Sequence, residues 1–237
     1  METLFFETSK KASKKPPGKR PLGQALRFLR FLFNLVLIFV VIALAVVSGL
    51  YAYVVYIHED KLERRYPDLA ENSSVYDVEG RQIGEFKAEE NRRTVGEGDL
   101  GKYLSQAVVA VEDKRFYEHW GVDFTGISRA AWTDLRALTL SQGGSTITEQ
   151  LVKNLYISEE RRGQVSPWRR FEQAALSFAY ERRHTKEEIL TAYLNTVYFG
   201  DGAYGAEEAA EKYFGKSASD LSLDEAAALA GFLHAPS

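Results

Sequence analysis

Several residues suited to acid–base chemistry lie together in the stretch AVEDKRFYEHWG, residues 110–121. The apolar residues from Leu104 to Val111 are typical of a buried helix, which would end at two carboxylates, Glu112 and Asp113. Because apolar surroundings favour the protonated form of a carboxyl group, Glu112 is a candidate acid or base near neutral pH, with His119 seven residues further on. The alternative is a solvated helix end, where such charges are common.

A second stretch, QGGSTITEQLVKN at residues 142–154, has features of an anion site. Gly143 and Gly144 allow the backbone to approach a ligand, and Ser145 and Thr146 open a helix whose free N–H groups favour phosphate. Thr146 and Glu149 also have the spacing of a capping box, whatever else they do. Three further polar residues share one face of this helix: Gln150, Lys153 and Asn154.

A third stretch, PWRRFEQAALSFAYERR at residues 167–183, predicts an amphipathic helix. One face carries Trp168, Phe171, Ala175 and Phe178, and the opposite face carries Arg169 and Gln173. Positive charge gathers near the second stretch, at Arg161, Arg162, Arg169 and Arg170. Such a run is usually a solvated face, and the alternative is a site for an anionic lipid headgroup.

The elements that hold these stretches are predicted from composition and periodicity. The 237 residues are 45% hydrophobic with a net charge of −3, which predicts one globular domain and gives no indication of nucleic-acid binding. There is no cysteine, so disulfides and thiolate chemistry are excluded. The sequence contains no P-loop, no zinc pair of the form H-E-x-x-H and no G-x-S-x-G elbow.

The segment 31–57 has no Asp, Glu, Lys, Arg or His, and is long enough to cross a bilayer. The alternatives are a buried helix of a soluble protein and a cleaved signal peptide, and the length of the apolar segment disfavours both. Residues 1–30 form a basic tail, predicted to be cytoplasmic, which places the later residues outside. This tail has acidic residues only at Glu2 and Glu7, and its basic residues are Lys10, Lys11, Lys14, Lys15, Lys19, Arg20, Arg27 and Arg30.

Residues 58–98 are predicted to be a connector that contains a β-hairpin at 75–86, with its turn at Asp77–Gly80. Residues 99–237 have helical periodicity. Three capping-box patterns begin at Thr146, Thr185 and Ser222. Helices are expected near 100–113, 124–139, 146–156, 167–183, 186–197, 205–213 and 223–233.

Four stretches together resemble the peptidoglycan glycosyltransferases of glycosyltransferase family 51, which include class A penicillin-binding proteins and monofunctional transglycosylases. They are EDKRFYEHWG, GGSTITEQLVKN, YLNTVYFGDGAYG (193–205) and AAEKYFGKSASDLSLDEAAALAG, in the family's order. The resemblance implies a mostly α, lysozyme-like glycosyltransferase domain with a short β-hairpin, preceded by one transmembrane helix. It also implies polymerisation of lipid II into glycan strands, with inversion and release of undecaprenyl diphosphate.

The resemblance assigns roles by position. Glu112 would be the catalytic base, and Lys153 would lie near the diphosphate. The other residues implied to bind substrate or shape its pocket are Asp113, Phe116, His119, Ser145, Thr146, Gln150, Asn154, Arg162, Arg169, Arg170, Asn195 and Tyr198. The resemblance also implies a divalent cation, Mg²⁺ or Mn²⁺. The implied partners are lipid II, the growing glycan chain, the bilayer of the bacterial inner membrane and other cell-wall synthesis proteins.

The sequence departs from the family pattern at two positions. Gln173 stands where the third motif has a glutamate, and Glu149 stands where the second motif has a glutamine. We hypothesise that Glu149, or Glu172 one position earlier, supplies the lost charge at the catalytic site. A catalytically weak scaffold that binds lipid II is the alternative function, and a lytic enzyme is a weaker one. The end at AGFLHAPS is expected to be a truncation within the domain, because a following basic helix and transpeptidase domain are implied.

Overall fold

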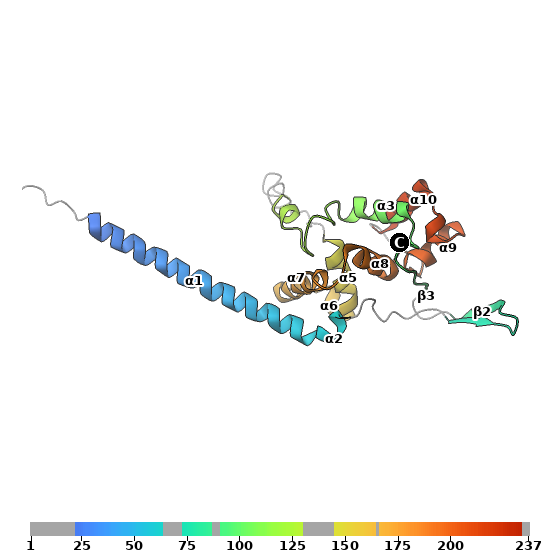
Figure 1. Cartoon of the computed structure of the whole chain (residues 1–237), viewed down its shortest axis with the longest axis horizontal. Helices are drawn as coiled ribbons and strands as arrows, with labels where there is room; N and C mark the ends of the chain where they lie inside the picture. The colour runs from blue at the N-terminus through green and yellow to red at the C-terminus, as the bar shows by residue number, and fades with distance from the viewer. Residues whose placement is uncertain (1–21, 64–72, 87–90, 130–144, 165, 234–237) are drawn as a thin grey trace, which may run out of the picture. The chain divides into compact units, whose positions relative to one another are not determined.

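The structure is a computed structural model that describes residues 22–63, 73–86, 91–129, 145–164 and 166–233. The chain divides into two units between Gly49 and Leu50. The first unit holds most of α1, Leu22–Ile57, in its described part (Figure 1). The segment Leu26–Ile57 of this helix has a mean hydropathy of 2.9 and is long and apolar enough to cross a membrane, which confirms the predicted apolar helix.

The last two turns of α1 belong to the second unit and pack into its core. Val54 has no exposed area, and the ring of Tyr51 lies edge-on to the ring of Phe178 at 6.0 Å. The short helix α2, Glu59–Leu62, follows, and its Leu62 is also fully buried. The carbonyl oxygen of Leu62 lies 2.9 Å from Nε2 of His184. Contacts made by the end of α1 and by the following helix α2 therefore fix this part of the chain on the second unit.

The predicted hairpin is confirmed. Strands β1, Ser73–Tyr76, and β2, Gln82–Phe86, pair antiparallel. Asp77 holds the turn because its Oδ1 accepts hydrogen bonds from the backbone N–H groups of Glu79 and Arg81, at 2.9 and 2.8 Å.

The predicted helices are confirmed to within two residues wherever they are described. They are α3 Lys102–Glu112, α5 Ile147–Tyr156, α7 Pro167–Glu181, α8 Lys186–Thr196, α9 Ala206–Phe214 and α10 Leu223–Phe232. Residues 124–129 are helical, and the rest of the expected 124–139 helix lies outside the described residues. The short helices α6, Glu159–Arg162, and η1, Ala218–Asp220, were not predicted.

All three predicted capping boxes are present. At α5, α8 and α10 the hydroxyl of the capping residue accepts from the backbone N–H three residues on, and the glutamate there accepts from the N–H of the capping residue. Each box satisfies two donors at the start of a helix from residues only three apart. This is why their positions were predictable from sequence.

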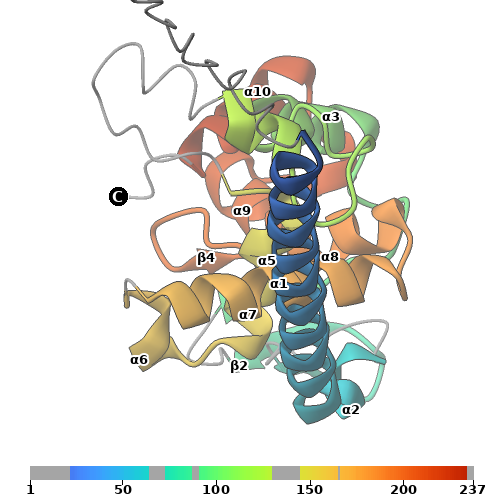
Figure 2. The ribbon, with the colours of Figure 1, turned by 90° about the vertical axis from the view of Figure 1, so that its left-hand side faces the viewer.

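The helices of the second unit pack around α8. Helix α5 contacts both α7 and α8, while α3 packs on α10 (Figure 2). Every residue of α8 from Ile189 to Thr196 is buried, so this helix is rigidly held. Helices α3, α5, α7 and α8 contribute large core side chains: Leu104, Leu151, Leu176, Tyr180 and Leu194.

One pairing had no local signal. Strands β3, Asn91–Arg92, and β4, Ala203–Tyr204, form a parallel pair although they are more than a hundred residues apart. The side chain of Asn195 fastens the same segment, because its amide accepts from the N–H of Val95 at 3.0 Å and donates to the carbonyl of Val95 at 2.9 Å.

Candidate active site

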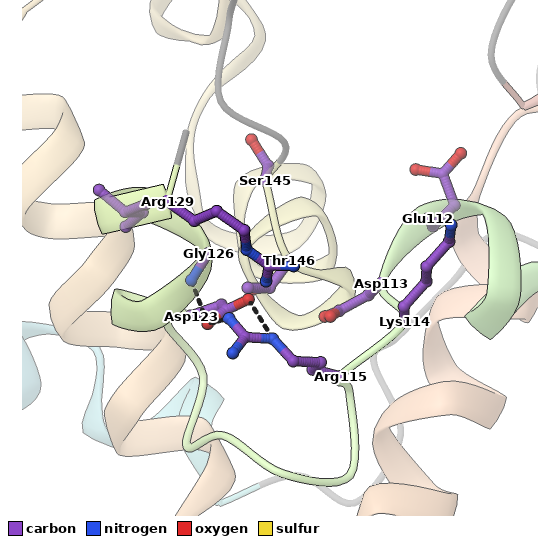
Figure 3. A pocket seen from close by; sticks show the side chains of 10 residues that line it. Glu112, Asp113, Lys114, Arg115, Asp123, Gly126, Arg129, Ser145 and Thr146 are labelled. Carbon is purple, nitrogen blue, oxygen red and sulfur yellow. Dashed lines mark hydrogen bonds and ion pairs between the residues drawn. The ribbon is translucent and has the colours of Figure 1, made fainter. Parts of the chain in front are cut away.

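Glu112 is the last residue of α3 and lines a cavity of about 230 Å³. Figure 3 shows Glu112 and Lys114 on one side of this cavity and Asp123 and Arg129 on the other, with Ser145 between them. The end of α3, the loop after it, the following helical turn and the start of α5 all contribute. The described residues that line it are Glu112, Asp113, Lys114, Arg115, Asp123, Gly126, Ile127, Arg129, Ser145 and Thr146.

The carboxylate of Glu112 is held by a side chain of α5. The amide Nε2 of Gln150 donates to Oε2 of Glu112 at 2.7 Å. The hydroxyl of Tyr193, on α8, donates in turn to Oε1 of Gln150 at 3.1 Å. Three helices therefore meet at the candidate base through two consecutive hydrogen bonds. Sequence reasoning gave Tyr193 no role.

Asp113 joins the end of α3 to the start of α5. Its Oδ2 lies 2.9 Å from Nε2 of His119 and accepts a hydrogen bond from the backbone N–H of Ile147 at 3.1 Å. Both Asp113 and the ring of His119 are largely buried. The Asp113–His119 pair therefore fixes the loop that follows Glu112 and ties it to the start of α5.

The start of α5 is not a free anion site, contrary to the prediction. The backbone N–H of Thr146 donates to the carboxylate of Glu149, and the N–H of Ile147 donates to the carboxylate of Asp113. The N–H of Glu149 donates to the hydroxyl of Thr146. Two carboxylates also stand where an anion would bind, and they would repel it. The hydroxyl of Thr146 donates to the carbonyl of Gly121 at 2.6 Å. The predicted glycines Gly143 and Gly144 lie outside the described residues.

The loop after α3 closes on the following helix through an ion pair that the sequence did not indicate. The guanidinium of Arg115 is paired with the carboxylate of Asp123, which also accepts from the N–H of Gly126 at 2.8 Å. The hydrogen bonds from Arg115 hold the pKa of Asp123 well below its usual range. Asp123 is thus a charged, fixed wall of the cavity at neutral pH.

Phe116, in the loop after α3, has no exposed area. The ammonium of Lys186 lies 4.4 Å from the centre of its ring and donates to the carbonyl of His119 at 2.8 Å. Lys186 also pairs with Glu181 at 2.7 Å, and Glu181 accepts from Thr148 at 2.6 Å. A buried polar network thus ties the loop to α5 and α7.

One turn further along α5, Lys153 lies close to two other cations, Arg162 and Arg169, and the three are called the cation cluster below. Burial lowers the pKa of Lys153, and the charges of Arg169 and Arg162 lower it further. Arg162 donates to the carbonyls of Asn154 and Ile157, at 2.7 and 3.1 Å. Arg169 donates to the carbonyl of Gln164 and to Gln173, at 2.6 and 3.1 Å. Within the described part of the chain, no carboxylate forms an ion pair with these three cations.

Gln173 is buried between this cation cluster and α5. Its Oε1 accepts from Arg169, and its Nε2 donates to the backbone carbonyl of Glu149 at 2.9 Å. A glutamate here could make only the first of these bonds, because a carboxylate has no donor. The second departure, Glu149, lies at the start of α5, where burial raises its pKa and the charge of Arg170 acts against this shift.

The sequence comparisons bear on this site. The transglycosylase family model matches residues 79–237, more than half of the chain, and covers each stretch described above. The chain belongs to the transglycosylase family.

Penicillin-binding protein 1A of Neisseria flavescens is 43% identical over 178 residues, 75% of this chain and 21% of that protein. Penicillin-binding protein 1A of Aquifex aeolicus is 40% identical over 200 residues, 82% of this chain and 27% of that protein. The chain thus spans about a fifth to a quarter of the length of these relatives. The resemblance to transglycosylase domains of class A penicillin-binding proteins is confirmed.

In this transglycosylase domain, Glu172 does not face the cation cluster. Its carboxylate pairs with Arg161, and the ring of His58 lies 3.5 Å away. Glu172 therefore connects α7 to α6 and to the residue between α1 and α2. Glu149 contacts Gln173 through its backbone carbonyl, whereas its carboxylate accepts from the N–H of Thr146.

Two predicted substrate-binding residues of the transglycosylase domain have other contacts. Asn195 is buried and holds the backbone of Val95, as described above. The hydroxyl of Tyr198 accepts from the N–H of Gly202 at 3.1 Å, and its ring lies 4.8 Å from that of Tyr204. Neither lines the cavity at Glu112. Their predicted roles stay predictions.

The residues that face the cavity do not form a ready site for the implied Mg²⁺ or Mn²⁺. No group of three or more His, Asp and Glu side chains with metal-ligating geometry occurs among the described residues. Asp113 and Asp123 already accept from protein donors, which leaves them poorly placed to bind a cation. The cation stays a prediction.

Proposed function

We propose that this transglycosylase domain is a peptidoglycan glycosyltransferase that polymerises lipid II, with Glu112 as its general base. One observation carries the proposal: α5 bears Gln150, which binds Glu112, and one turn further Lys153, which belongs to a cation cluster that pairs with no carboxylate of the described residues. An inverting glycosyl transfer from a lipid diphosphate needs a base for the attacking hydroxyl and cations for the leaving group. Residues three apart on a helix lie about 4.5 Å apart along its axis.

The reaction follows from these positions. The acceptor's 4-hydroxyl oxygen attacks the anomeric carbon of the donor, and its proton passes to Glu112. The bond between the anomeric carbon and the diphosphate oxygen breaks, and its electron pair leaves with undecaprenyl diphosphate. Lys153, with Arg162 and Arg169, stabilises the charge that develops on this leaving group. Attack from the face opposite the diphosphate inverts the anomeric centre.

The cations are suited to this role because they are desolvated and unneutralised. A half-buried ammonium without a carboxylate partner is costly, and a bound diphosphate offsets that cost. Gln173 fits the same proposal, since its neutral amide orders Arg169 without cancelling its charge. The loss of the family glutamate is therefore compatible with catalysis. Mg²⁺ or Mn²⁺, if required, would act with the substrate's phosphates.

The proposed substrate also explains the apolar helix. A lipid-linked donor stays in the bilayer, so an enzyme that acts on its headgroup gains from a domain fixed beside the membrane, as the buried end of α1 provides. The basic residues before α1 favour a cytoplasmic N-terminus and an extracytoplasmic domain in the bacterial inner membrane. Lipid II, the glycan chain and other cell-wall synthesis proteins are the proposed partners.

The test is polymerisation of fluorescent lipid II by the purified chain in detergent, read as glycan ladders on a gel. Glu112→Gln is expected to lower the rate by about 100-fold or more. Glu118→Gln, a change of the same kind at an exposed residue of the same loop, is the matched control and should leave the rate unchanged. Ladders that persist in Glu112→Gln would overturn the proposal. Binding of lipid II without product by the wild type would favour the scaffold, and cleavage of finished glycan would favour a lytic enzyme.

A further inference from the structure

Tyr193 has no exposed area and lies in the fully buried part of α8. Its hydroxyl donates to Oε1 of Gln150 at 3.1 Å, and its ring belongs to the buried hydrophobic core. Burial raises the pKa of Tyr193, so the phenol remains neutral and able to donate throughout the working range of pH. A buried hydroxyl that donates to a side chain bound to the candidate base requires an explanation.

The explanation lies in the two-sided chemistry of an amide. The carbonyl oxygen of Gln150 accepts hydrogen bonds, and its NH₂ group donates them, so the amide can face Glu112 in two ways. With its oxygen toward Tyr193, the amide presents Nε2 to Glu112, as observed at 2.7 Å. The reverse orientation would place two acceptor oxygens against each other whenever Glu112 is ionised. The carbonyl of Ser145, 3.5 Å from the same Nε2, also favours the observed orientation.

We propose that Tyr193 is a positioning residue, which holds the amide of Gln150 so that it donates to Glu112 and fixes the base at the edge of the cavity. This inference rests on the proposed function of Glu112 as the base. α8 is suited to the task because eight consecutive residues of it are buried, so the hydroxyl is presented from a rigid element. The substrate does not touch Tyr193, which acts only through Gln150.

A donor to a carboxylate favours its ionised form, so the relay affects the pH range in which the base works. If the hydroxyl is removed, Gln150 is no longer held, and its hydrogen bond to Glu112 is weakened. The acid limb of the pH profile should then move to higher pH. The other charged and titratable groups near Glu112, from α3, its loop, the next helical turn and α5, are Asp113, Lys114, Arg115, His119, Asp123, Arg129 and Glu149. The Tyr193→Phe variant leaves all of these in place.

The test compares Tyr193→Phe with wild type by lipid II polymerisation across pH. We expect kcat to fall by about 10-fold with little change in KM, and the acid limb to move up by roughly one pH unit. Tyr213→Phe is the matched control, because it also removes one hydroxyl bonded to an oxygen, the carbonyl of Phe199, away from Glu112. An unchanged profile in Tyr193→Phe would overturn the inference, and so would a lower kcat without movement of the acid limb.

A second variant keeps the inference testable if Tyr193→Phe does not fold. Gln150→Met removes the amide and retains the tyrosine, so its acid limb must also move up. A stationary limb overturns the relay. In the double variant, Tyr193→Phe should add no further movement, and an additive shift would mean that Tyr193 acts by another route. Activity that survives Glu112→Gln overturns the base and the relay together. If Glu112→Gln is inactive and Tyr193→Phe has the pH profile of wild type, the relay is overturned while Glu112 stays the base.

Discussion

The substitution Gln173→Glu restores the family's glutamate and tests how this site manages its charges. In the structure Gln173 accepts from Arg169 and donates to the carbonyl of Glu149. A glutamate keeps the first bond and strengthens it into an ion pair, but it loses the second and places an oxygen against a carbonyl oxygen. The lost hydrogen bond costs about 1 kcal/mol, which the new ion pair partly offsets. We therefore expect the melting temperature to fall by no more than about 4 °C.

The larger effect should be on substrate affinity, because a carboxylate beside Arg169 cancels one charge of the cation cluster. At an effective dielectric constant of 20, a unit charge about 7 Å from a bound anion contributes about 2 kcal/mol. Partial solvent exposure reduces this to about 1–2 kcal/mol, or roughly 5- to 30-fold in affinity. The charge of Arg169 also contributes to the lowered pKa of Lys153, so its neutralisation should raise that pKa.

The assay is polymerisation of fluorescent lipid II by wild type and Gln173→Glu, with KM, kcat and the basic limb of the pH profile measured separately. We expect KM to rise within the calculated range and the basic limb to move to higher pH as Lys153 holds its proton longer. Gln106→Glu, at an exposed position of α3, makes the same change in total charge and should have neither effect. A large gain in activity from Gln173→Glu would refute this reasoning and identify the natural chain as a weakened enzyme.

Three further predictions concern the same framework. Arg169→Gln should raise KM and move the basic limb upward, because the charge that depresses the pKa of Lys153 is removed; an unmoved limb contradicts this. Gly121→Ala should lower the free energy of unfolding by about 2 kcal/mol or more, measured by denaturant titration. Gly121 has φ of +79°, and an added Cβ would lie 2.7 Å from the backbone of Ser177, so a variant as stable as wild type would contradict the close approach. Thr185→Ala should lower the melting temperature by about 2–4 °C without changing turnover, since only the capping box of α8 is lost.

Local signals in the sequence predicted most of the helices correctly. The capping boxes that begin at Thr146, Thr185 and Ser222 each place both partners within three residues, so nothing distant is needed to recognise them. The hairpin was equally predictable, because Asp77 satisfies the turn by itself. The pairing of β3 with β4 was not, since it depends on segments brought together only by the packed helices.

Four residues that the sequence named, Glu112, Asp113, Ser145 and Thr146, line the cavity, but their contacts could not be predicted. Sequence spacing placed Gln150 and Lys153 on one face, and the structure retains both near the proposed chemistry. Sequence spacing could not show that the N–H of Ile147 donates to Asp113, because that hydrogen bond joins residues 34 apart. The helix start therefore looked available to phosphate when its donors were already satisfied by the protein.

Helix α7 shows why pattern alone misjudges such a site. Trp168 and Phe178 are exposed although they lie on the predicted apolar face. Arg169, Glu172 and Gln173 are buried, as are apolar residues of the same helix such as Leu176. The sequence does not show that the polar face is covered as well. Burial of the polar face is possible because each of these side chains has a partner, in Gln164, Arg161 and Glu149 respectively.

The burial of polar side chains on α7 explains how one helix, α5, can serve both halves of the proposed reaction. Its side toward α8 and α3 meets the hydroxyl of Tyr193 and the carboxylate of Glu112 through Gln150. Where it meets α7, the carbonyl of Glu149 is held by Gln173, and the buried polar face of α7 supplies Arg169 to the cation cluster. The base and the cations are therefore coupled through one rigid helix. A change that shifts α5 along its axis should impair both kcat and affinity, whereas changes confined to Tyr193 or Arg169 should impair mainly one of them.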